Sequence, residues 1–219
     1  MDACPLYKKK WNYSWRRIRK WLKPEQDTEE YERKLIELCS LLWLEKQGFV
    51  KIYYGDESRF SMNSYLPSAW QPIGKPIAIV PRRSVGINVF GLLSRDMDFH
   101  PYTSSHNINS TLVVAFIDDF AKKINEPTVI VLDNASTHRS EEFKDQIVEW
   151  EEMGLYIFHL PTYSPHLNII ETLWRKIKYE WMHQHHFTGS DSFFKGLESI
   201  LLGIGDKFNI IFKDQLLPV

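Results

Sequence analysis

The sequence predicts an α/β protein built on a mixed β-sheet, and three observations support this. Thr128–Leu132 is a continuous run of β-branched and apolar residues, which is typical of a strand buried on both faces. From residue 110 onward, helix-like and strand-like segments alternate, an order that requires parallel crossover connections. Before that point, three strand-like segments follow one another, which favours an antiparallel meander. The predicted order is therefore β-β-β-α-β-α-β-α, preceded by a helical arm.

The individual elements follow from local patterns. Strands are expected where β-branched and aromatic residues stand between turn residues. The expected strands are Phe49–Tyr54, Val85–Ser94, Phe99–Ser104, Thr128–Leu132 and Leu155–Leu160. Helices are expected where apolar residues recur every three or four positions. The expected helices are Ser14–Lys23, Thr28–Gln47, Ser110–Ile124, Ser140–Met153, Leu167–Met182 and Asp191–Leu202. Ser14 can cap the first helix and Pro24 ends it, while Gly48 ends the second.

The charges are divided unevenly along the chain. Its 219 residues carry 27 Lys and Arg against 28 Asp and Glu, a formal net charge of −1. Residues 1–23 hold eight of these bases and one acid, so this arm is +7 and the remainder is −8. Such an arm can hold DNA through its phosphates, or it can be a solvated helix face whose aromatic residues pack on the body. The candidates for DNA binding in the arm are Arg16, Arg17, Arg19, Lys20 and Lys23.

Composition excludes several classes of protein. The hydrophobic content of 43% and the charged content of 25% are those of a globular protein and not of a disordered chain. Cys4 and Cys39 have no partners at metal-ligand spacing, which excludes a disulfide framework and a structural zinc site. The apolar runs are too short for a membrane span, and no apolar stretch follows the basic N-terminus as it does in a signal peptide. We therefore expect a cytoplasmic protein without a membrane partner.

Three carboxylates stand where α/β proteins place their ligands. Asp56 follows the first strand, Asp133 follows the buried strand, and Glu171 lies early in the helix after a Pro-rich turn. Sites in open α/β sheets lie beyond the carboxyl ends of strands, so neighbouring first and fourth strands would bring both Asp together. Converging carboxylates repel one another unless a cation lies between them, and such ligands suit Mg²⁺ or Mn²⁺. Taken singly, each could instead be a turn or surface residue.

The residues around these carboxylates resemble a known family. The matching segments are Tyr54–Ser58 (YGDES), Ala69–Lys75 (AWQPIGK), Val131–His138 (VLDNASTH) and Leu160–Trp174 (LPTYSPHLNIIETLW). They resemble the catalytic blocks of DDE-type transposases of the mariner-like superfamily, and the resemblance is closest to the bacterial insertion sequence 630 family. The resemblance implies a ribonuclease H-like fold, which agrees with the predicted element order. It also implies that Asp56, Asp133 and Glu171 are a catalytic, metal-binding triad.

The resemblance further implies metal-dependent cleavage and strand transfer of DNA. Two Mg²⁺ or Mn²⁺ ions would hold the scissile phosphate for in-line attack by water or by a DNA 3′-OH. The implied partners are double-stranded DNA, both transposon terminal inverted repeats and target, and a second copy of the chain in a homodimer on that DNA. The implied location is the nucleoid of a prokaryote. One alternative is another ribonuclease H-like nuclease, and another is a catalytically silent or truncated relic that still binds DNA.

Neighbouring residues are candidates for supporting roles. Asn134 and His138 fit the family block and could orient a ligand or phosphate, or could serve the turn and the start of a helix. Asn168 could face the metal site or cap its helix, and capping is our expectation. Arg175 and Lys178 could contact DNA phosphates or be solvated.

Three further features have structural expectations. Trp174 is expected in the core, and Glu57 is expected on the opposite side of its strand from Asp56 if that strand continues. The histidines at 183, 185 and 186 are expected at the surface.

The chain is expected to have three parts. Residues 1–48 would be a basic helix and a connector helix, a remnant of a helix-turn-helix region. Residues 49–187 would be the ribonuclease H-like catalytic domain, and residues 188–219 a helical tail. In the resembled family, two DNA-recognising helix-turn-helix units precede the catalytic domain, and the 55 residues before Asp56 are too few for two such units. We therefore expect a catalytic half that lacks sequence-specific binding to transposon ends.

Overall fold

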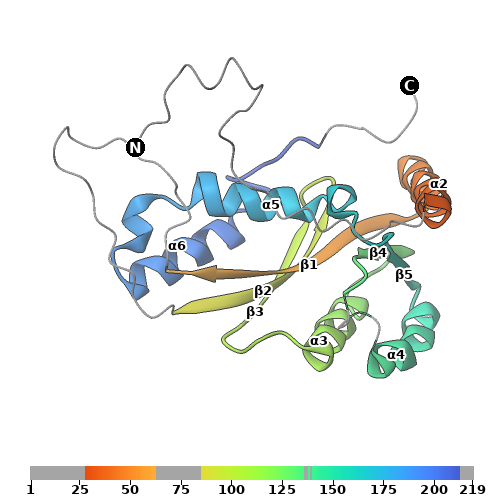
Figure 1. Ribbon diagram of the computed structural model, residues 1–219, viewed down its shortest axis with the longest axis horizontal. Helices are drawn as coiled ribbons and strands as arrows, with labels where there is room; N and C mark the ends of the chain where they lie inside the picture. Colours follow the sequence, from red (N-terminus) through yellow and green to blue (C-terminus); the bar gives the residue numbers. More distant parts are fainter. Residues whose placement is uncertain (1–27, 63–84, 136–137, 139, 213–219) are drawn as a thin grey trace, which may run out of the picture.

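The computed structural model describes residues 28–62, 85–135, 138 and 140–212. The basic helix expected at Ser14–Lys23 lies outside these residues, together with the basic candidates of the arm. The described strands and helices follow the predicted order (Figure 1). The strands are β1 (Lys51–Ser61), β2 (Gly86–Ser94), β3 (Phe99–Ser104), β4 (Thr128–Leu132) and β5 (Leu155–His159). The α-helices are α2 (Thr28–Lys46), α3 (Ser110–Ala121), α4 (Glu141–Glu152), α5 (Ile170–Lys176) and α6 (Ser190–Leu202).

The described strands form one mixed sheet in the order β3-β2-β1-β4-β5. β1 pairs antiparallel with β2, and β2 pairs antiparallel with β3, which confirms the predicted meander. On its other side β1 pairs in parallel with β4, and β4 pairs in parallel with β5. The first and fourth strands are therefore neighbours, as the convergence of the two aspartates requires.

β1 is longer than the sequence predicts, and this is the main correction to the fold. The turn residues Gly55–Glu57 predict an end at that point, but β1 runs on to Ser61. Antiparallel pairing with β2 continues along this whole stretch, and Asp56 stands opposite Gly91. The pairing satisfies the backbone and buries the ring of Phe60, so tertiary contacts outweigh the local turn preference. Asp56 therefore lies within a strand and not at its end.

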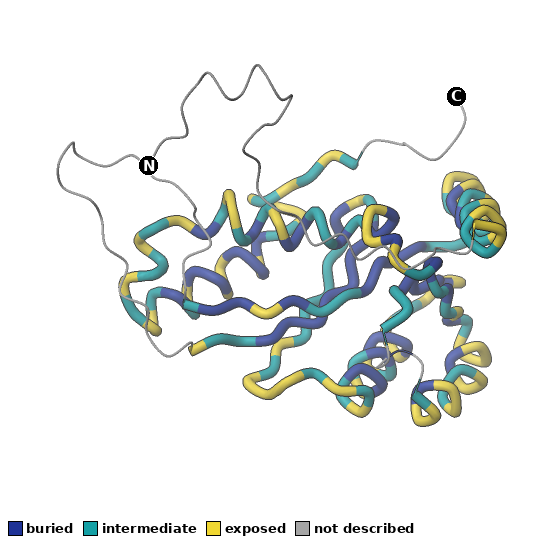
Figure 2. The backbone as a smooth tube through the Cα atoms, viewed as in Figure 1, coloured by how far each residue is buried: buried dark blue, intermediate teal, exposed yellow. Residues whose placement is uncertain are grey.

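Helices cover both faces of the sheet, and buried residues line the strands between them (Figure 2). α2, α5 and α6 contribute to the core on one face, whereas α3 and α4 contribute to the core on the other. The side chains of β1 alternate between these cores, with Tyr54 and Phe60 in the first and Tyr53 in the second. The same alternation directs Asp56 towards α5 and Glu57 towards the opposite face, as expected.

The helix expected at Leu167–Met182 is divided into shorter pieces. A 3-10 turn, Pro165–Leu167, precedes α5, and a π-helical turn, Ile177–Trp181, follows it. A π-helical turn is wider than an α-helical turn, so it changes the direction of the side chains that it carries. Next comes a 3-10 turn, Gln184–Phe187, whose histidines are exposed or half-buried as expected, and then α6. In the part of the chain that the structure describes, no helix is long and apolar enough to cross a membrane.

Candidate active site

Asp56 provides a partly buried carboxylate on the face of β1 that α5 covers. Its Oδ2 accepts a hydrogen bond of 3.0 Å from the indole Nε1 of Trp174. Burial raises the pKa of Asp56, and the nearby charges of Glu171, Glu57 and Asp133 raise it further, to about 7. The carboxylates named in the sequence therefore lie close enough to act on one another. Negative charge at Asp56 is poorly compensated by the protein.

Asp133 lies one residue beyond β4, beside Asp56. The parallel register pairs Tyr54 with Val131, and two further residues along each strand lead to the two aspartates. Asp133 Oδ1 accepts a hydrogen bond of 3.0 Å from the backbone N–H of Ala135 and lies 3.0 Å from His138 Nδ1. The hydrogen bond from His138 lowers the pKa of Asp133, although partial burial opposes that change. This second aspartate is therefore held ionised by a partner within the protein.

His138 links the two faces of the site. Its side chain is fully buried, and its Nε2 lies 3.4 Å from Glu57 Oε1 while its Nδ1 faces Asp133. Burial alone disfavours the imidazolium, but the hydrogen bond with Asp133 and the ionic contacts with Glu57 and Asp133 outweigh it and raise the pKa of His138 to about 9. At neutral pH His138 is therefore a buried cation between two carboxylates. Its contacts support a role in orienting Asp133, whereas the sequence left this role and a structural one open.

Asn168 connects the start of α5 to β1 and does not cap the helix. The N-cap position of α5 is Ile169, which supplies no side-chain hydrogen bond, so the expected cap is wrong. Instead the buried Nδ2 of Asn168 donates a hydrogen bond of 3.1 Å to the carbonyl of Gly55. Its Oδ1 is buried without a hydrogen-bond partner. The contact with the residue before Asp56 fixes the register of α5, and hence of Glu171, against β1.

Two basic candidates follow Glu171 on the same helical segment, in different surroundings. Arg175 is exposed at the end of α5. Lys178 lies in the π-helical turn, with its Nζ 5.3 Å from the centre of the Phe60 ring. Burial lowers the pKa of Lys178, and the charges of Glu171 and Asp56 act in the opposite direction. The sequence spacing of Arg175 and Lys178 does not predict this difference, because Lys178 lies in a π-helical turn, which changes the direction of its side chain.

Asn134 makes a contact that connects two strands of the sheet. Asn134 Nδ2 donates a hydrogen bond of 2.9 Å to the carbonyl of Leu160, which joins the ends of β4 and β5.

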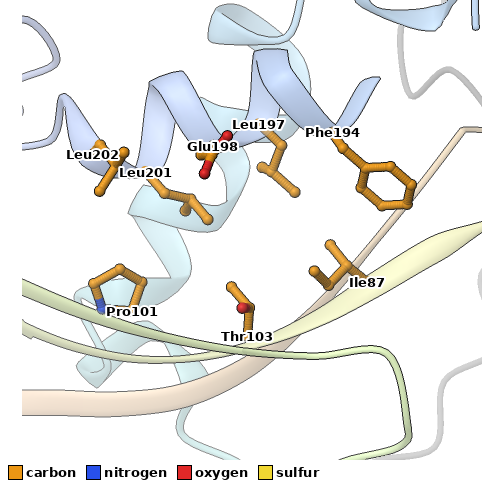
Figure 3. Close-up of a pocket in the computed structure, with 8 residues that line it drawn as sticks. All are labelled: Ile87, Pro101, Thr103, Phe194, Leu197, Glu198, Leu201 and Leu202. Carbon is orange, nitrogen blue, oxygen red and sulfur yellow. The ribbon is translucent and has the colours of Figure 1, made fainter. Parts of the chain in front are cut away.

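A mainly apolar cavity of about 440 Å³ lies between α6 and strands β2 and β3, with Glu198 among its lining residues (Figure 3). None of the three candidate carboxylates lines it, so it is separate from the site. A second hollow of about 280 Å³ adjoins Glu57 and is lined by Arg59, Asn88 and other residues of β1, β2 and the segment before α3.

The donor set fits a hard divalent cation by its chemistry. Carboxylate oxygens are the ligands that Mg²⁺ and Mn²⁺ prefer, and a cation would favour the ionised form of Asp56, whose pKa is raised by burial and by the neighbouring carboxylates. Among residues 28–62, 85–135, 138 and 140–212, no three metal-ligating side chains are grouped closely enough to coordinate an ion as they stand. The arrangement is thus a convergence of charge around Asp56.

A protein-family model described as a DDE superfamily endonuclease matches residues 51–193, well over half of the chain. The chain belongs to the DDE superfamily of endonucleases. Asp56, Asp133 and Glu171 all lie within the part of this DDE endonuclease domain that the family model covers. A comparison with curated proteins found no match.

Solved structures extend the likeness of this DDE endonuclease domain to its fold. The Mos1 strand transfer complex has a TM-score of 0.55 and 15% identity, covering 86% of this chain and 58% of that one. The Mos1 mariner paired end complex with Mn also has a TM-score of 0.55, with 16% identity, covering 87% of this chain and 60% of that one. The fold is therefore ribonuclease H-like, as the sequence predicts. The chain spans about three fifths of the length of these two Mos1 chains. The comparisons do not identify the insertion sequence 630 family.

Proposed function

We propose that this chain is the catalytic domain of a DDE transposase of the insertion sequence 630 type, which cleaves DNA at transposon ends and joins it to a target. The observation that carries the proposal is the convergence of Glu171 and Asp133 on Asp56, whose pKa rises to about 7. Carboxylates that gather where two parallel strands meet suit the binding of cations, and through them of phosphate. Membership of the DDE superfamily supports the same reaction class.

Asp56, Asp133 and Glu171 would hold the metal, as two Mg²⁺ or Mn²⁺ ions. Bound there, the ions supply Lewis-acid activation of the attacking water or 3′-OH and stabilise charge on the leaving oxygen. The Mos1 paired end complex is described with Mn, which supports this choice of cation. His138 keeps Asp133 ionised and oriented through a hydrogen bond of 3.0 Å. The protein residues thus position the carboxylates before a cation and a phosphate arrive.

Basic residues around the carboxylates would bind the DNA. Lys178, whose charge interacts with Glu171 and Asp56, would contact the phosphate next to the scissile bond, whereas exposed Arg175 would contact a phosphate farther along the strand. The basic residues of the arm, Arg16, Arg17, Arg19, Lys20 and Lys23, would add contacts that are independent of sequence. The Mos1 complexes are described as paired end and strand transfer complexes. We extend from them the proposal that two copies of this chain act together on transposon ends.

A nicking and strand-transfer assay tests the proposed function. The full chain is incubated with supercoiled plasmid, a labelled oligonucleotide with a free 3′-OH, and Mn²⁺ or Mg²⁺. We expect nicked plasmid and joined product, and we expect Asp133→Asn to reduce both by roughly a hundredfold or more, the order of loss when a group that stabilises the transition state is removed. Asp145→Asn is the matched control, because Asp145 is an exposed residue of α4 outside the site.

The outcome of this assay separates the alternatives. Nicked plasmid without joined product favours a ribonuclease H-like nuclease that only hydrolyses. No metal-dependent product, together with retained DNA binding, favours a silent relic of a transposase. Equal activity of Asp133→Asn and the unaltered chain contradicts the assignment of the site.

A further inference from the structure

α5 and the residues just before it contact β1 through two hydrogen bonds that lie on either side of Glu171. Asn168, three residues before Glu171, donates to the carbonyl of Gly55 at 3.1 Å. Trp174, three residues after it, donates from Nε1 to Asp56 Oδ2 at 3.0 Å. Glu171 and Trp174 are three residues apart within α5 and therefore lie on the same side of the helix, the side that faces β1, whereas Asn168 precedes the helix in an extended conformation. Figure 1 shows α5 lying over β1.

The indole of Trp174 is closely packed against residues of β1, β2 and β3. Its side chain is almost fully buried, and its ring packs edge-on against Phe60 and Phe99, with centroid distances of 5.8 and 6.0 Å. Gly91 stands opposite Asp56 in the register of β1 and β2. A Cβ atom at Gly91 would lie 2.7 Å from Cη2 of Trp174, so the absence of a side chain there makes room for the ring. The ring therefore lies against the strand pair at the position of Asp56.

The hydrogen bond from Trp174 is specific to one oxygen of Asp56. A buried indole N–H must find an acceptor within the protein, because an unpaired buried donor is costly. A carboxylate acceptor makes the bond charge-assisted and hence strong. With Oδ2 engaged by Trp174, rotation of the Asp56 carboxylate is restricted.

We propose that Trp174 is a positioning residue of the site, which orients the Asp56 carboxylate for a divalent cation through its indole N–H. The inference rests on the proposed function and adds to it a part of the metal site that the sequence assigns only to the core. Loss of a partner that orients a metal ligand reduces metal affinity by roughly 10- to 100-fold. A purely structural role predicts loss of stability without a selective loss of metal affinity.

The test compares Trp174→Phe with Trp150→Phe in the full chain. Both substitutions remove a buried indole N–H that donates to an Asp carboxylate, since Trp150 Nε1 bonds Asp118 Oδ1 at 2.6 Å in the other core. Mn²⁺ dissociation constants are measured by calorimetry and by the electron paramagnetic resonance signal of free Mn²⁺, and stability is measured by urea unfolding without metal. We expect Trp174→Phe to raise the Mn²⁺ dissociation constant by roughly 10- to 100-fold. We expect Trp150→Phe to leave it within about twofold, with a loss of stability comparable to that of Trp174→Phe.

A second replacement covers the case in which Trp174→Phe does not fold. Benzothienylalanine at position 174 keeps the shape of the indole and replaces its N–H with sulfur, so packing against Phe60 and Phe99 is retained. The same loss of Mn²⁺ affinity is expected. Wild-type Mn²⁺ affinity in this protein or in Trp174→Phe overturns the inference and leaves the proposed function standing, as does an equal loss in Trp150→Phe. An unaltered chain that binds no Mn²⁺ overturns the proposed function, and the inference with it.

Discussion

The two aspartates of the site lie on neighbouring strands, yet their surroundings act on them in opposite directions. Asp56 is enclosed between β1 and α5 near other carboxylates, and its pKa is raised to about 7. Asp133 lies half-exposed beyond β4 with buried His138 against it, and its pKa is lowered. The two aspartates that we propose as metal ligands thus differ in how the protein compensates their charge. Asp133 has an internal cation beside it, whereas in the proposed site the charge of Asp56 would be compensated by a bound cation.

The largest effect is expected from replacing His138, because Asp133 and Glu57 then lose the cation that they share. We expect His138→Ala to lower the free energy of unfolding at pH 6 by about 3 kcal/mol, the order of loss when one partner of a buried ion pair is removed. The raised pKa of His138 stabilises the fold fully below pH 6.5, and this contribution is lost as the pH rises through about 9. The deficit of the variant should therefore shrink between pH 6.5 and 9.

Urea unfolding at several pH values measures this deficit, with His106→Ala as the control at an exposed histidine. A deficit that stays constant from pH 6 to pH 10 contradicts the assignment of a buried cation.

Replacing Asp56 removes the aspartate whose pKa is raised. We expect Asp56→Asn to raise the free energy of unfolding of the metal-free chain at pH 8 by about 2 kcal/mol, because it removes a partly buried charge beside other carboxylates. Since the pKa of Asp56 is raised, its contribution to stability is full below about pH 4 and is lost as the pH rises through about 7. The unaltered metal-free chain should therefore lose stability between about pH 4 and pH 7, and the variant should lose less.

Asp133→Asn provides the contrast within the site, because the pKa of Asp133 is lowered and its charge stabilises the fold near neutral pH. Thermal unfolding in the presence of a chelator distinguishes the two variants. Loss of stability in both would show that the two carboxylates are equally compensated.

Replacing Lys178 is expected to have a smaller effect, on the binding of DNA. Lys178 is the cation whose charge interacts with Asp56 and Glu171 across the site. In the proposed complex it neutralises one phosphate, so we expect Lys178→Met to weaken DNA binding about equally for all sequences and to reduce the salt slope by about one. Fluorescence anisotropy at several salt concentrations measures the slope, with Lys207→Met as an exposed control. An unchanged slope would place Lys178 away from the phosphates.

The sequence alone determined the elements and the order in which they follow one another. The buried strand Thr128–Leu132 was predicted with the bounds that the structure has, because continuous burial on both faces leaves a continuous apolar run. The convergence of Asp56, Asp133 and Glu171 was predicted from their positions and from the resemblance. Their role as metal ligands remains a proposal. The elements are readable because residues close in sequence carry their patterns, and the motif around each carboxylate is likewise local.

The contacts that complete the site join distant segments of the chain and are visible only in the folded structure. β1 continues through Asp56 because β2, some thirty residues later, supplies its backbone partners. Asn168 and Trp174 contact β1 across more than a hundred residues of chain, and His138 contacts Glu57 on the face of the sheet that lies opposite α5. No local pattern encodes a hydrogen bond between distant segments, since it depends on how a helix is docked and rotated against a strand. That docking determines that Oδ2 of Asp56 accepts the hydrogen bond of Trp174.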